Sequence, residues 1–278
     1  MLEIGKLQRL NVVKIVDFGI YLNETRQSDQ NNVLLPMKQV PKDTKIGDAL
    51  EVFIYKDSSD RIIATTNTPA LTIGEIAPLK VKEVTNIGAF LDWGLEKDLL
   101  LPFKEQTTKV EVGQEYLVSL YLDKSKRLCA TMKIYHHLRH DGDFRENQHV
   151  TGRIYEFSDN FGVFVAVEDQ YHGLIPKKEV HQKLKIGQVV KARIVSVRSD
   201  GKLDLSLQEK AYIQMDKDAK MIMDRIEEIG GRLPFTDKAN PELIKKEFGL
   251  SKNAFKRAVG RLLKQDKITI KDDSIFIK

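Results

Sequence analysis

The sequence predicts a mainly β protein in which three similar small domains are followed by a different, C-terminal α+β domain. Three observations support this prediction. A glycine followed two residues later by an aromatic residue occurs three times, in "VDFGIYL", "TNIGAFL" and "DNFGVFV". Each copy continues with two apolar residues and a proline, then an apolar–glycine turn, then a strand–turn–strand. After the third copy the hydrophobic pattern changes from short β-type runs to helical periodicity.

The spacing inside the copies repeats as well as the order. Glycine and proline are equally far apart in the second copy (Gly88 and Pro102) and in the third (Gly162 and Pro176). The first copy is longer because a polar insertion, "ETRQSDQNN", lies between its glycine and its proline. The distance from each proline to the next turn glycine is the same in all three copies. Chance does not preserve such spacing, so we interpret the copies as three domains of one fold.

Each copy consists of short runs rich in Val, Ile, Leu and aromatic residues, broken by glycine, Asp-Ser and asparagine turns. This pattern is typical of a small all-β barrel or sandwich, and not of strands that alternate with helices. A domain of this size buries only a modest core, so we expect neighbouring domains to pack together. We place the four domains at residues 1–70, 71–142, 143–210 and 211–278.

The paired aromatic residues suggest a surface role. Side chains three residues apart point to opposite faces of a straight strand, so Phe161 and Phe164 share a face only if the chain bulges between them. Gly162 permits that bulge. Two rings on one face would form a platform on which nucleic-acid bases stack, at roughly 1–3 kcal/mol per base. The alternative is that these rings belong to the core.

The last seventy residues predict helices and a hairpin. We expect a first helix over residues 218–231, a second over residues 240–249 and a third after the N-cap Ser251. The final segment, "KITIKDDSIFIK", predicts a hairpin with its turn at residues 271–273. The expected apolar stripes consist of Met221, Ile222, Ile226 and Ile229 in the first helix and Phe255, Val259, Leu262 and Leu263 in the third.

The third copy resembles the S1 RNA-binding domain, an OB-fold β-barrel. The resemblance is carried by Gly152, Phe161-Gly162-Val163-Phe164, Gly173-Leu174, Ile186-Gly187 and Leu205-Ser206-Leu207. It implies that the two aromatic residues stack on bases, and that an Asp and an Arg four residues apart near the last turn contact RNA. The corresponding pairs are Asp57/Arg61, Asp123/Arg127 and Arg198/Lys202 in the three copies. The second copy has Ile87 in place of the first aromatic residue.

The C-terminal domain resembles a winged helix. In that family the third helix usually reads a nucleic-acid groove, and here it carries Lys252, Lys256, Arg257, Arg261 and Lys264 outside its apolar stripe. These cations would contact phosphates. The alternatives are an ordinary solvated helix face, or a winged helix that contacts protein.

The order of three S1-like barrels and a winged helix makes the whole chain similar to the conserved virulence factor B family. That resemblance implies a cytoplasmic RNA-binding protein that regulates gene expression after transcription, with virulence as one output. The RNA-binding candidates are Phe161, Phe164, Lys178, Arg193, Arg198, Lys202, Lys252, Lys256, Arg257 and Arg261. The secondary candidates are Phe18, Tyr21, Arg61, Phe90 and Arg127.

Other classes of protein fit the sequence less well. The chain contains no phosphate-binding glycine loop, metalloprotease motif or nucleophile elbow, so we expect no enzyme and no cofactor. The histidines His136, His137 and His140 lie between the second and third copies, where we interpret them as linker residues and not as a metal site. We interpret the single cysteine, Cys129, as a buried structural thiol. No stretch approaches the length of a membrane span.

The leading hypothesis is sequence-tolerant binding of single-stranded RNA. The net charge of +5 and the pI near 9.0 favour a polyanionic partner, and the second half of the chain carries the positive charge. A second hypothesis makes the winged helix a reader of duplex DNA and the protein a transcription regulator, and we rank it below the first. A third makes the first two barrels an adaptor that docks to an RNase or the ribosome.

Overall fold

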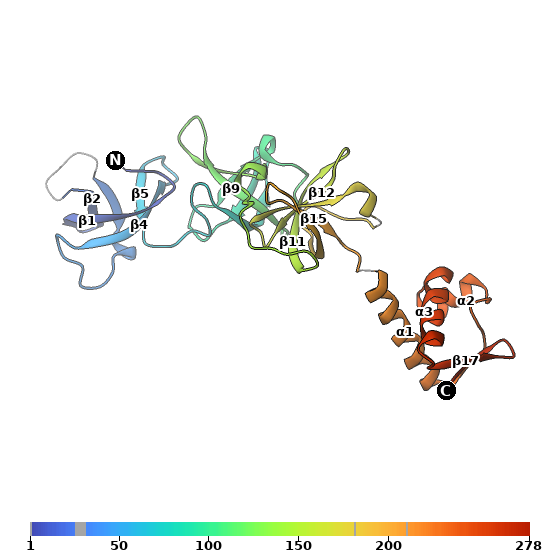
Figure 1. Cartoon of the computed structure of the whole chain (residues 1–278). Coiled ribbons are helices and arrows are strands. Elements are labelled where there is room, and N and C mark those ends of the chain that lie inside the picture. Colours follow the sequence, from blue (N-terminus) through green and yellow to red (C-terminus); the bar gives the residue numbers. More distant parts are fainter. Residues whose placement is uncertain (1, 26–31, 181, 210) are drawn as a thin grey trace. The chain divides into compact units, whose positions relative to one another are not determined.

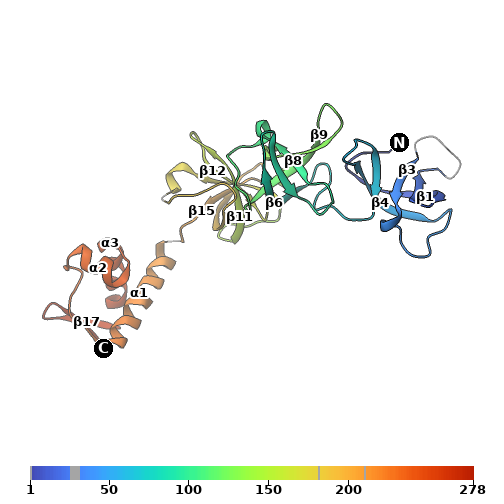
Figure 2. The same cartoon turned by 180° about the vertical axis from the view of Figure 1, so that it is seen from behind.

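The computed structural model describes residues 2–25, 32–180, 182–209 and 211–278. It divides into two compact units, Met1–Leu207 and Gln208–Lys278. The first unit holds three closed five-stranded barrels, and the second is a small winged-helix fold; Figures 1 and 2 show both units from opposite sides. This confirms the predicted fold class. Residues 26–31 of the predicted polar insertion lie outside the described residues. The domain boundaries that we expect at residues 70, 142 and 210 stay predictions.

The three barrels share one topology, in which the first strand pairs with the second and fourth, and the third strand runs parallel to the fifth. The first barrel consists of β1 (Leu7–Val16), β2 (Gly19–Asn23), β3 (Val33–Pro36), β4 (Ala49–Lys56) and β5 (Ile62–Thr65). The second consists of β6 (Ile76–Val84), β7 (Gly88–Asp92), β8 (Leu99–Pro102), β9 (Glu115–Leu122) and β10 (Leu128–Thr131). The third consists of β11 (His149–Ser158), β12 (Gly162–Val167), β13 (Tyr171–Pro176), β14 (Val189–Val197) and β15 (Leu203–Ser206). Short 3-10 turns follow the prolines, η1 (Met37–Gln39), η2 (Phe103–Glu105) and η4 (Lys177–Glu179), and η3 (Tyr135–His137) lies between the second and third barrels.

The repeated glycine allows the second strand of each barrel to approach the third. Each glycine lies directly opposite the repeated proline, in the pairs Gly19–Pro36, Gly88–Pro102 and Gly162–Pro176. A Cβ on Gly88 would lie 2.4 Å from the carbonyl oxygen of Leu101, and one on Gly162 would lie 2.2 Å from that of Ile175. The cross-strand pairing therefore explains why the glycine and the proline keep their spacing.

The apolar–glycine turn closes each barrel onto its first strand. In each copy the turn glycine donates its N–H to a carbonyl of that strand over 2.8 Å, in the pairs Gly47–Val12, Gly113–Val81 and Gly187–Ile154. The register of the first strand shifts just after the accepting residue. The constant distance from the proline to this glycine follows from this contact.

The bulge that we predict between Phe161 and Phe164 is wrong in its position. The register shift lies in β11, between Ile154 and Glu156, and Phe161 belongs to the turn that precedes β12. Gly162 contributes differently, because its φ of 128° turns the chain at the first residue of the strand. The two rings nevertheless lie close together, with their centroids 6.4 Å apart.

Neighbouring barrels of the first unit pack through apolar residues on the outer faces of their strands. Both faces of β4 are buried, because Val52 and Ile54 point into the first barrel while Phe53 and Tyr55 pack with Trp93 of the second. The rings of Phe53 and Trp93 meet edge to face at 5.8 Å. A second shared cluster joins the second and third barrels and consists of Leu117, Ile134, Leu138, Tyr155 and Ala166, with Ile76 and Phe164 at its border.

The second unit contains three helices and a three-stranded sheet. Its elements are α1 (Ala211–Glu228), β16 (Arg232–Leu233), α2 (Pro241–Phe248), α3 (Lys252–Lys264), β17 (Ile268–Lys271) and β18 (Ser274–Ile277). Asn240 caps α2 by accepting the N–H of Glu242 over 3.0 Å, and Ser251 caps α3 by accepting that of Ala254 over 3.2 Å. These caps and the hairpin turn at Asp272 confirm the predicted boundaries of α2, α3 and the wing.

Three predictions for this unit are wrong. The first helix begins at Ala211 and not at residue 218, and ends before Ile229. The sequence analysis missed β16, a two-residue strand that pairs with β18. Met221, Ile229 and Leu263 are 42%, 37% and 40% exposed and therefore lie outside the apolar stripes. None of the helices in the described part of the chain combines the length and the apolar character that a membrane span requires.

We expect Gly88→Ala to lower the free energy of unfolding of the second barrel by about 2–4 kcal/mol, since a methyl group would meet the Leu101 carbonyl at a φ of 151°. The control is Gly113→Ala in the same barrel. Gly113 also has a positive φ, 84°, but nothing lies within 4 Å of its Cβ position, so the loss should be about 1 kcal/mol. Urea unfolding followed by the fluorescence of Trp93, the single tryptophan, measures both. Equal losses would show that the close approach is not limiting.

Candidate nucleic-acid interface

The third barrel presents an exposed aromatic ring beside a half-buried one. Phe161 is 62% exposed at the turn between β11 and β12, and Phe164 follows on the outer face of β12. Their ring planes are inclined by 60°. The two rings therefore share one surface, as we predict, but they form an angled pair and not a flat platform. Phe161 offers most of the accessible ring area.

Tyr135, which the sequence analysis missed, extends this surface. The ring of Tyr135 from η3 packs edge to face against Phe164 at 5.9 Å, and lies 4.7 Å from the ring of His172 on β13. Tyr155, which is buried in the cluster shared by the second and third barrels, lies 6.0 Å from Phe164. Burial lowers the pKa of His172, and the nearby Lys202 ammonium lowers it further. The sequence offered one signal for this contact. Tyr135 is an aromatic residue in the segment that links the second and third copies, and a linker residue can pack against the predicted aromatic platform.

The cations of the β14–β15 turn lie near these rings, and each has a carboxylate partner. The Arg198 guanidinium donates from Nε to Asp204 over 3.0 Å, and Lys202 pairs with Asp200 over 2.9 Å. The Lys202 ammonium also lies 5.9 Å from the centre of the Tyr135 ring. The hydrogen bond from Arg198 lowers the pKa of Asp204, against the effect of its partial burial. These positive charges are held in place by hydrogen bonds before any ligand binds.

Not every predicted residue of the third barrel lies at this surface. Lys178 is exposed on η4, two residues after Pro176, which faces Gly162. Arg193 pairs across the sheet with His149, the first residue of β11, whereas Phe161 follows the last residue of that strand. The structure therefore places Arg193 at the other end of β11 from the aromatic pair.

The first barrel repeats the aromatic pair of the third. Phe18 is 60% exposed, and its ring meets that of Tyr21 edge to face with the centroids again 6.4 Å apart. The Arg61 guanidinium donates from Nε to Asp57 over 2.9 Å, so the Asp and the Arg that the resemblance identifies pair with each other in this barrel. The first barrel thus presents the same kind of surface with a different arrangement of charge.

The second barrel departs from the pattern. Ile87 is 55% exposed where the other barrels have phenylalanine, and Phe90 is half-buried. The structure does not test the predicted RNA contacts of Asp123 and Arg127, but it shows that their side chains do not pair with each other. The Asp123 carboxylate accepts the backbone N–H of Arg127 over 2.9 Å, while the guanidinium reaches Asp60 of the first barrel with its Nε over 3.0 Å. The ion pair with Asp60 therefore directs the Arg127 side chain toward the first barrel.

The third helix of the second unit exposes only part of its predicted basic face. Lys256, Arg257 and Lys264 are exposed. Lys252 donates to the backbone carbonyl of Lys238 over 3.3 Å, and Arg261 donates to Asp216 of α1 over 2.8 Å. The outward cations of α3 are therefore centred on Lys256 and Arg257.

The predicted linker histidines take part in packing. His137 lies 3.3 Å from the Ser119 hydroxyl through its Nδ1, and His136 packs against Tyr135. Within the residues that the structure describes, no group of three or more histidine, cysteine, aspartate or glutamate side chains could hold a metal ion. Cys129 is buried, and burial raises the pKa of its thiol to about 11.

Comparison with protein-family models divides the chain in the same order as the fold. A model of the S1 domain matches residues 4–67 and 73–133, which contain the first two barrels. A model described as the second domain of the virulence regulatory factor CvfB matches residues 137–209, which contain the third. A model of the CvfB-like winged helix domain matches residues 220–276.

Two curated relatives and one solved structure match most of the chain. Conserved virulence factor B of Staphylococcus saprophyticus is 31% identical over 242 residues, which cover 84% of this chain and 81% of the relative. The protein of the same name from Staphylococcus aureus (strain bovine RF122) is 29% identical over 287 residues, which cover 99% of this chain and 94% of the relative. The crystal structure of a multidomain protein with nucleic acid binding domains from Streptococcus pneumoniae is 25% identical, with a TM-score of 0.54, and covers 99% of this chain and 98% of that one.

We expect Asp204→Asn to destabilise the β14–β15 turn by about 1 kcal/mol at pH 7, a value that allows for the partial exposure of its ion pair with Arg198. Because the folded-state pKa of Asp204 is lowered, its stabilisation is complete above the ordinary value of 3.8 and is lost as the pH falls below it. Hydrogen exchange of peptides that cover β14 and β15 measures the difference. The control is Asp200→Asn, which removes a carboxylate that is 51% exposed in its pair with Lys202, whereas that of Asp204 is 24% exposed. An equal loss in both variants, or a loss that does not depend on pH, would contradict this account.

Proposed function

The chain belongs to the conserved virulence factor B family, and from this membership we propose that it binds single-stranded RNA and thereby regulates gene expression after transcription. The observation that carries the proposal is the exposed ring of Phe161 beside Phe164, together with Lys202, whose ammonium lies over the Tyr135 ring that packs on Phe164. The matching S1 and winged-helix models describe binding domains and not catalytic ones, and we propose no reaction for this chain.

The aromatic pair favours an unpaired strand over a duplex. A ring that projects from a turn can stack on a base only where the face of that base is free, which is the case in single strands and loops. Stacking on Phe161 and Phe164 is tolerant of sequence, because every base has a π-face. The same pair in the first barrel, Phe18 and Tyr21, would extend the contact along the strand.

The surrounding charges suit the phosphate backbone. Arg198 and Lys202 lie in the β14–β15 turn near the rings, and Lys178 is exposed on η4. In the second unit, Lys256 and Arg257 would contact phosphates from α3. Such contacts add affinity without sequence information and make binding depend on salt. The proposed mechanism is occupancy, in which the protein shields RNA from, or exposes it to, nucleases and ribosomes.

A specific observation also favours a second function. The basic α3 is the helix that reads duplex DNA in many winged-helix proteins, so the protein could instead regulate transcription. A third proposal, docking of the first two barrels to an RNase or the ribosome, is compatible with the exposed apolar residues of those barrels, such as Phe103 at 51%.

We expect Phe161→Ala to weaken binding of a short single-stranded RNA by about 1–3 kcal/mol, a factor of roughly five or more, with little change in folding. The matched control is Phe157→Ala, which removes a ring that is 45% exposed on β11 of the same barrel. Fluorescence anisotropy with labelled RNA and with a DNA duplex of the same sequence measures the affinities. If the two variants lose affinity equally, or if the duplex binds more tightly than the single strand, the aromatic pair is not the binding site.

We expect the double variant Lys256→Ala/Arg257→Ala to reduce the dependence of RNA affinity on salt. The slope of log affinity against log salt should fall by about 0.7 for each lost phosphate contact with a single strand. The control is Lys245→Ala/Lys246→Ala, which removes two exposed cations from α2 of the same unit. Equal slopes for the two variants would argue against α3. If the α3 variant alone loses duplex binding, and Phe161→Ala changes neither RNA nor duplex affinity, the transcription regulator is favoured.

A further inference from the structure

A cleft of about 400 Å³ lies between the second and third barrels, which belong to the same compact unit. Its walls are the segments around the apolar–glycine turns of the second and third copies. The second barrel supplies Lys109 and Glu111, and the third supplies Leu184, Lys185 and the ring of Phe157 from β11. None of the RNA-binding candidates lines this cleft.

The turn of the third barrel is wedged against the second barrel, which fixes the width of the cleft. Ile186 packs against the cores of both barrels, whereas Val112, at the corresponding position of the second copy, is 61% exposed. A Cβ on Gly187 would lie 2.8 Å from the carbonyl oxygen of Glu115, so the two backbones are already in close contact. The Arg153 guanidinium lies 3.7 Å from the Glu115 carboxylate across the same junction. The cleft is therefore a fixed opening that the two barrels do not close.

An exposed ring and aliphatic side chains line the cleft. Phe157 is 45% exposed, and Leu184 and Ile186 are half-buried. A single exposed phenylalanine on a flat surface is common in soluble proteins. Here the ring lies in a preformed cleft, whose volume is within the roughly 300–1,000 Å³ that is typical of ligand pockets. The cleft therefore suits a ligand that brings one large apolar side chain.

The two lysines of the cleft have no partner in the described part of the chain. Lys109 and Lys185 are exposed, one on each wall, and the ammonium group of neither forms an ion pair or a hydrogen bond there. One carboxylate, that of Glu111, also lines the cleft, and the backbone N–H of Glu111 donates to the Tyr116 hydroxyl over 3.1 Å. Because the cations outnumber the carboxylate, the cleft favours an acidic ligand.

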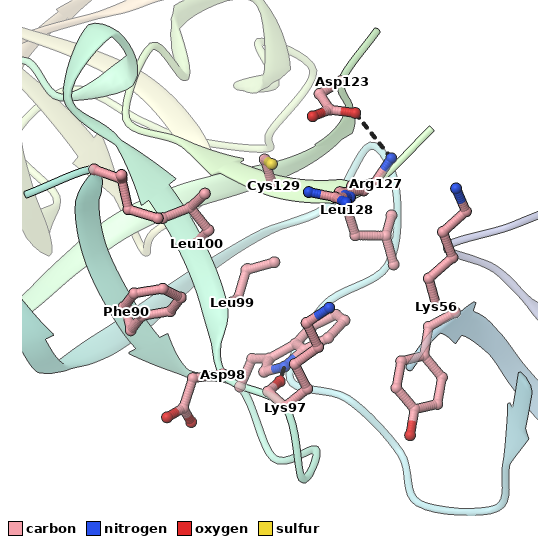
Figure 3. Close-up of a pocket in the computed structure, with 13 residues that line it drawn as sticks. Lys56, Phe90, Lys97, Asp98, Leu99, Leu100, Asp123, Arg127, Leu128 and Cys129 are labelled. Atoms are coloured by element: carbon pink, nitrogen blue, oxygen red, sulfur yellow. Dashed lines mark hydrogen bonds between the residues drawn. The ribbon is translucent and has the colours of Figure 1, made fainter. Parts of the chain in front are cut away.

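The junction of the first and second barrels shows the opposite arrangement. There the Lys56 ammonium donates to the backbone carbonyl of Ser125 over 3.0 Å, and that of Lys97 donates to the carbonyl of Asp57 over 3.1 Å. Figure 3 shows this space, with Lys56 of the first barrel opposite the strands of the second. The lysines of that junction contact the facing barrel, whereas the lysines of the cleft remain available to a ligand.

We propose that the cleft between the second and third barrels binds an acidic segment of a partner protein. One large apolar side chain of the segment packs against Phe157, and its carboxylates contact Lys109 and Lys185. A nucleic acid fits less well, because it brings a phosphate with every base and Glu111 repels phosphates. A peptide also brings backbone N–H groups, which the Glu111 carboxylate and the side chain of Gln114 can accept. This contact does not depend on RNA binding, and it would allow the chain to hold RNA and a protein together.

The experiment selects peptides from a random heptapeptide library on the full-length protein and measures the enriched peptides by fluorescence anisotropy. We expect the enriched sequences to combine one large apolar residue with two or more Asp or Glu residues. Phe157→Ala should weaken their binding at least about fivefold, because it removes the aromatic anchor of a small interface, and should leave RNA affinity unchanged. The matched control is Phe161→Ala, which removes an exposed ring of the same barrel outside the cleft and should leave peptide affinity unchanged.

The charges of the cleft allow a second test with the same peptides. Lys109→Gln/Lys185→Gln should weaken their binding about two- to tenfold, and Glu111→Gln should tighten it about twofold. The matched control is Lys42→Gln/Lys45→Gln, which removes two exposed cations near the corresponding turn of the first barrel, outside the cleft. Its peptide affinity should equal that of the wild type.

Several outcomes would overturn the proposal, and they differ from failure of the proposed function. If no sequence is enriched, or if the enriched sequences are basic, the cleft does not bind an acidic segment. If Phe157→Ala and Phe161→Ala weaken peptide binding equally, the peptides bind elsewhere. If Phe157→Ala weakens RNA binding and leaves peptide binding unchanged, the cleft belongs to the RNA-binding surface. If acidic peptides bind as described while RNA does not bind, the cleft stands and the RNA-binding function falls.

Discussion

The contact between a glycine and a carbonyl oxygen of the neighbouring strand governs the structure of all three barrels. At the start of each second strand, the backbone of the third strand lies so close that a Cβ would overlap its carbonyl oxygen, at 2.4 Å for Gly19 and Gly88 and at 2.2 Å for Gly162. In addition, the backbone N–H of the turn glycine donates a hydrogen bond to a carbonyl of the first strand. These two contacts allow five short strands to close into a barrel, which leaves no unpaired sheet edge along its wall.

The same constraint creates the exposed aromatic residues. Because the strand starts at the glycine, the preceding residue belongs to the turn and its side chain projects from the barrel, as the exposures of Phe18 and Phe161 show. The aromatic residue two positions after the glycine points outward from the strand, and its partner in the turn meets it at the same ring distance in both barrels. A device for closing the barrel thus also sets the geometry of a candidate base-stacking surface.

The sequence predicts much of this architecture because local chemistry determines it. Glycine, proline and turn residues at fixed spacing identified the three barrels, and the residues Asn240 and Ser251 marked the starts of two helices through their ability to cap them. The strand shift in β11 escaped prediction because it depends on pairing with β12 and β14, which no local pattern reports. Tyr135 and Asp60 escaped for a related reason. Tyr135 contacts Phe164 and Asp60 contacts Arg127, each in a neighbouring domain, and no local sequence pattern reports a contact between domains.

The pairing of cations with carboxylates changes how the basic character of this chain should be understood. The net charge is only +5, and the cations nearest to the aromatic surfaces, Arg198, Lys202 and Arg127, each already have a carboxylate partner. A phosphate that binds there shares each cation with a carboxylate, so the gain is smaller than for an unpaired cation. Stacking on exposed rings involves no such sharing. In the proposed complex with RNA, the aromatic residues, and not the charges, would therefore supply most of the affinity at the barrels, while the paired charges would orient the strand.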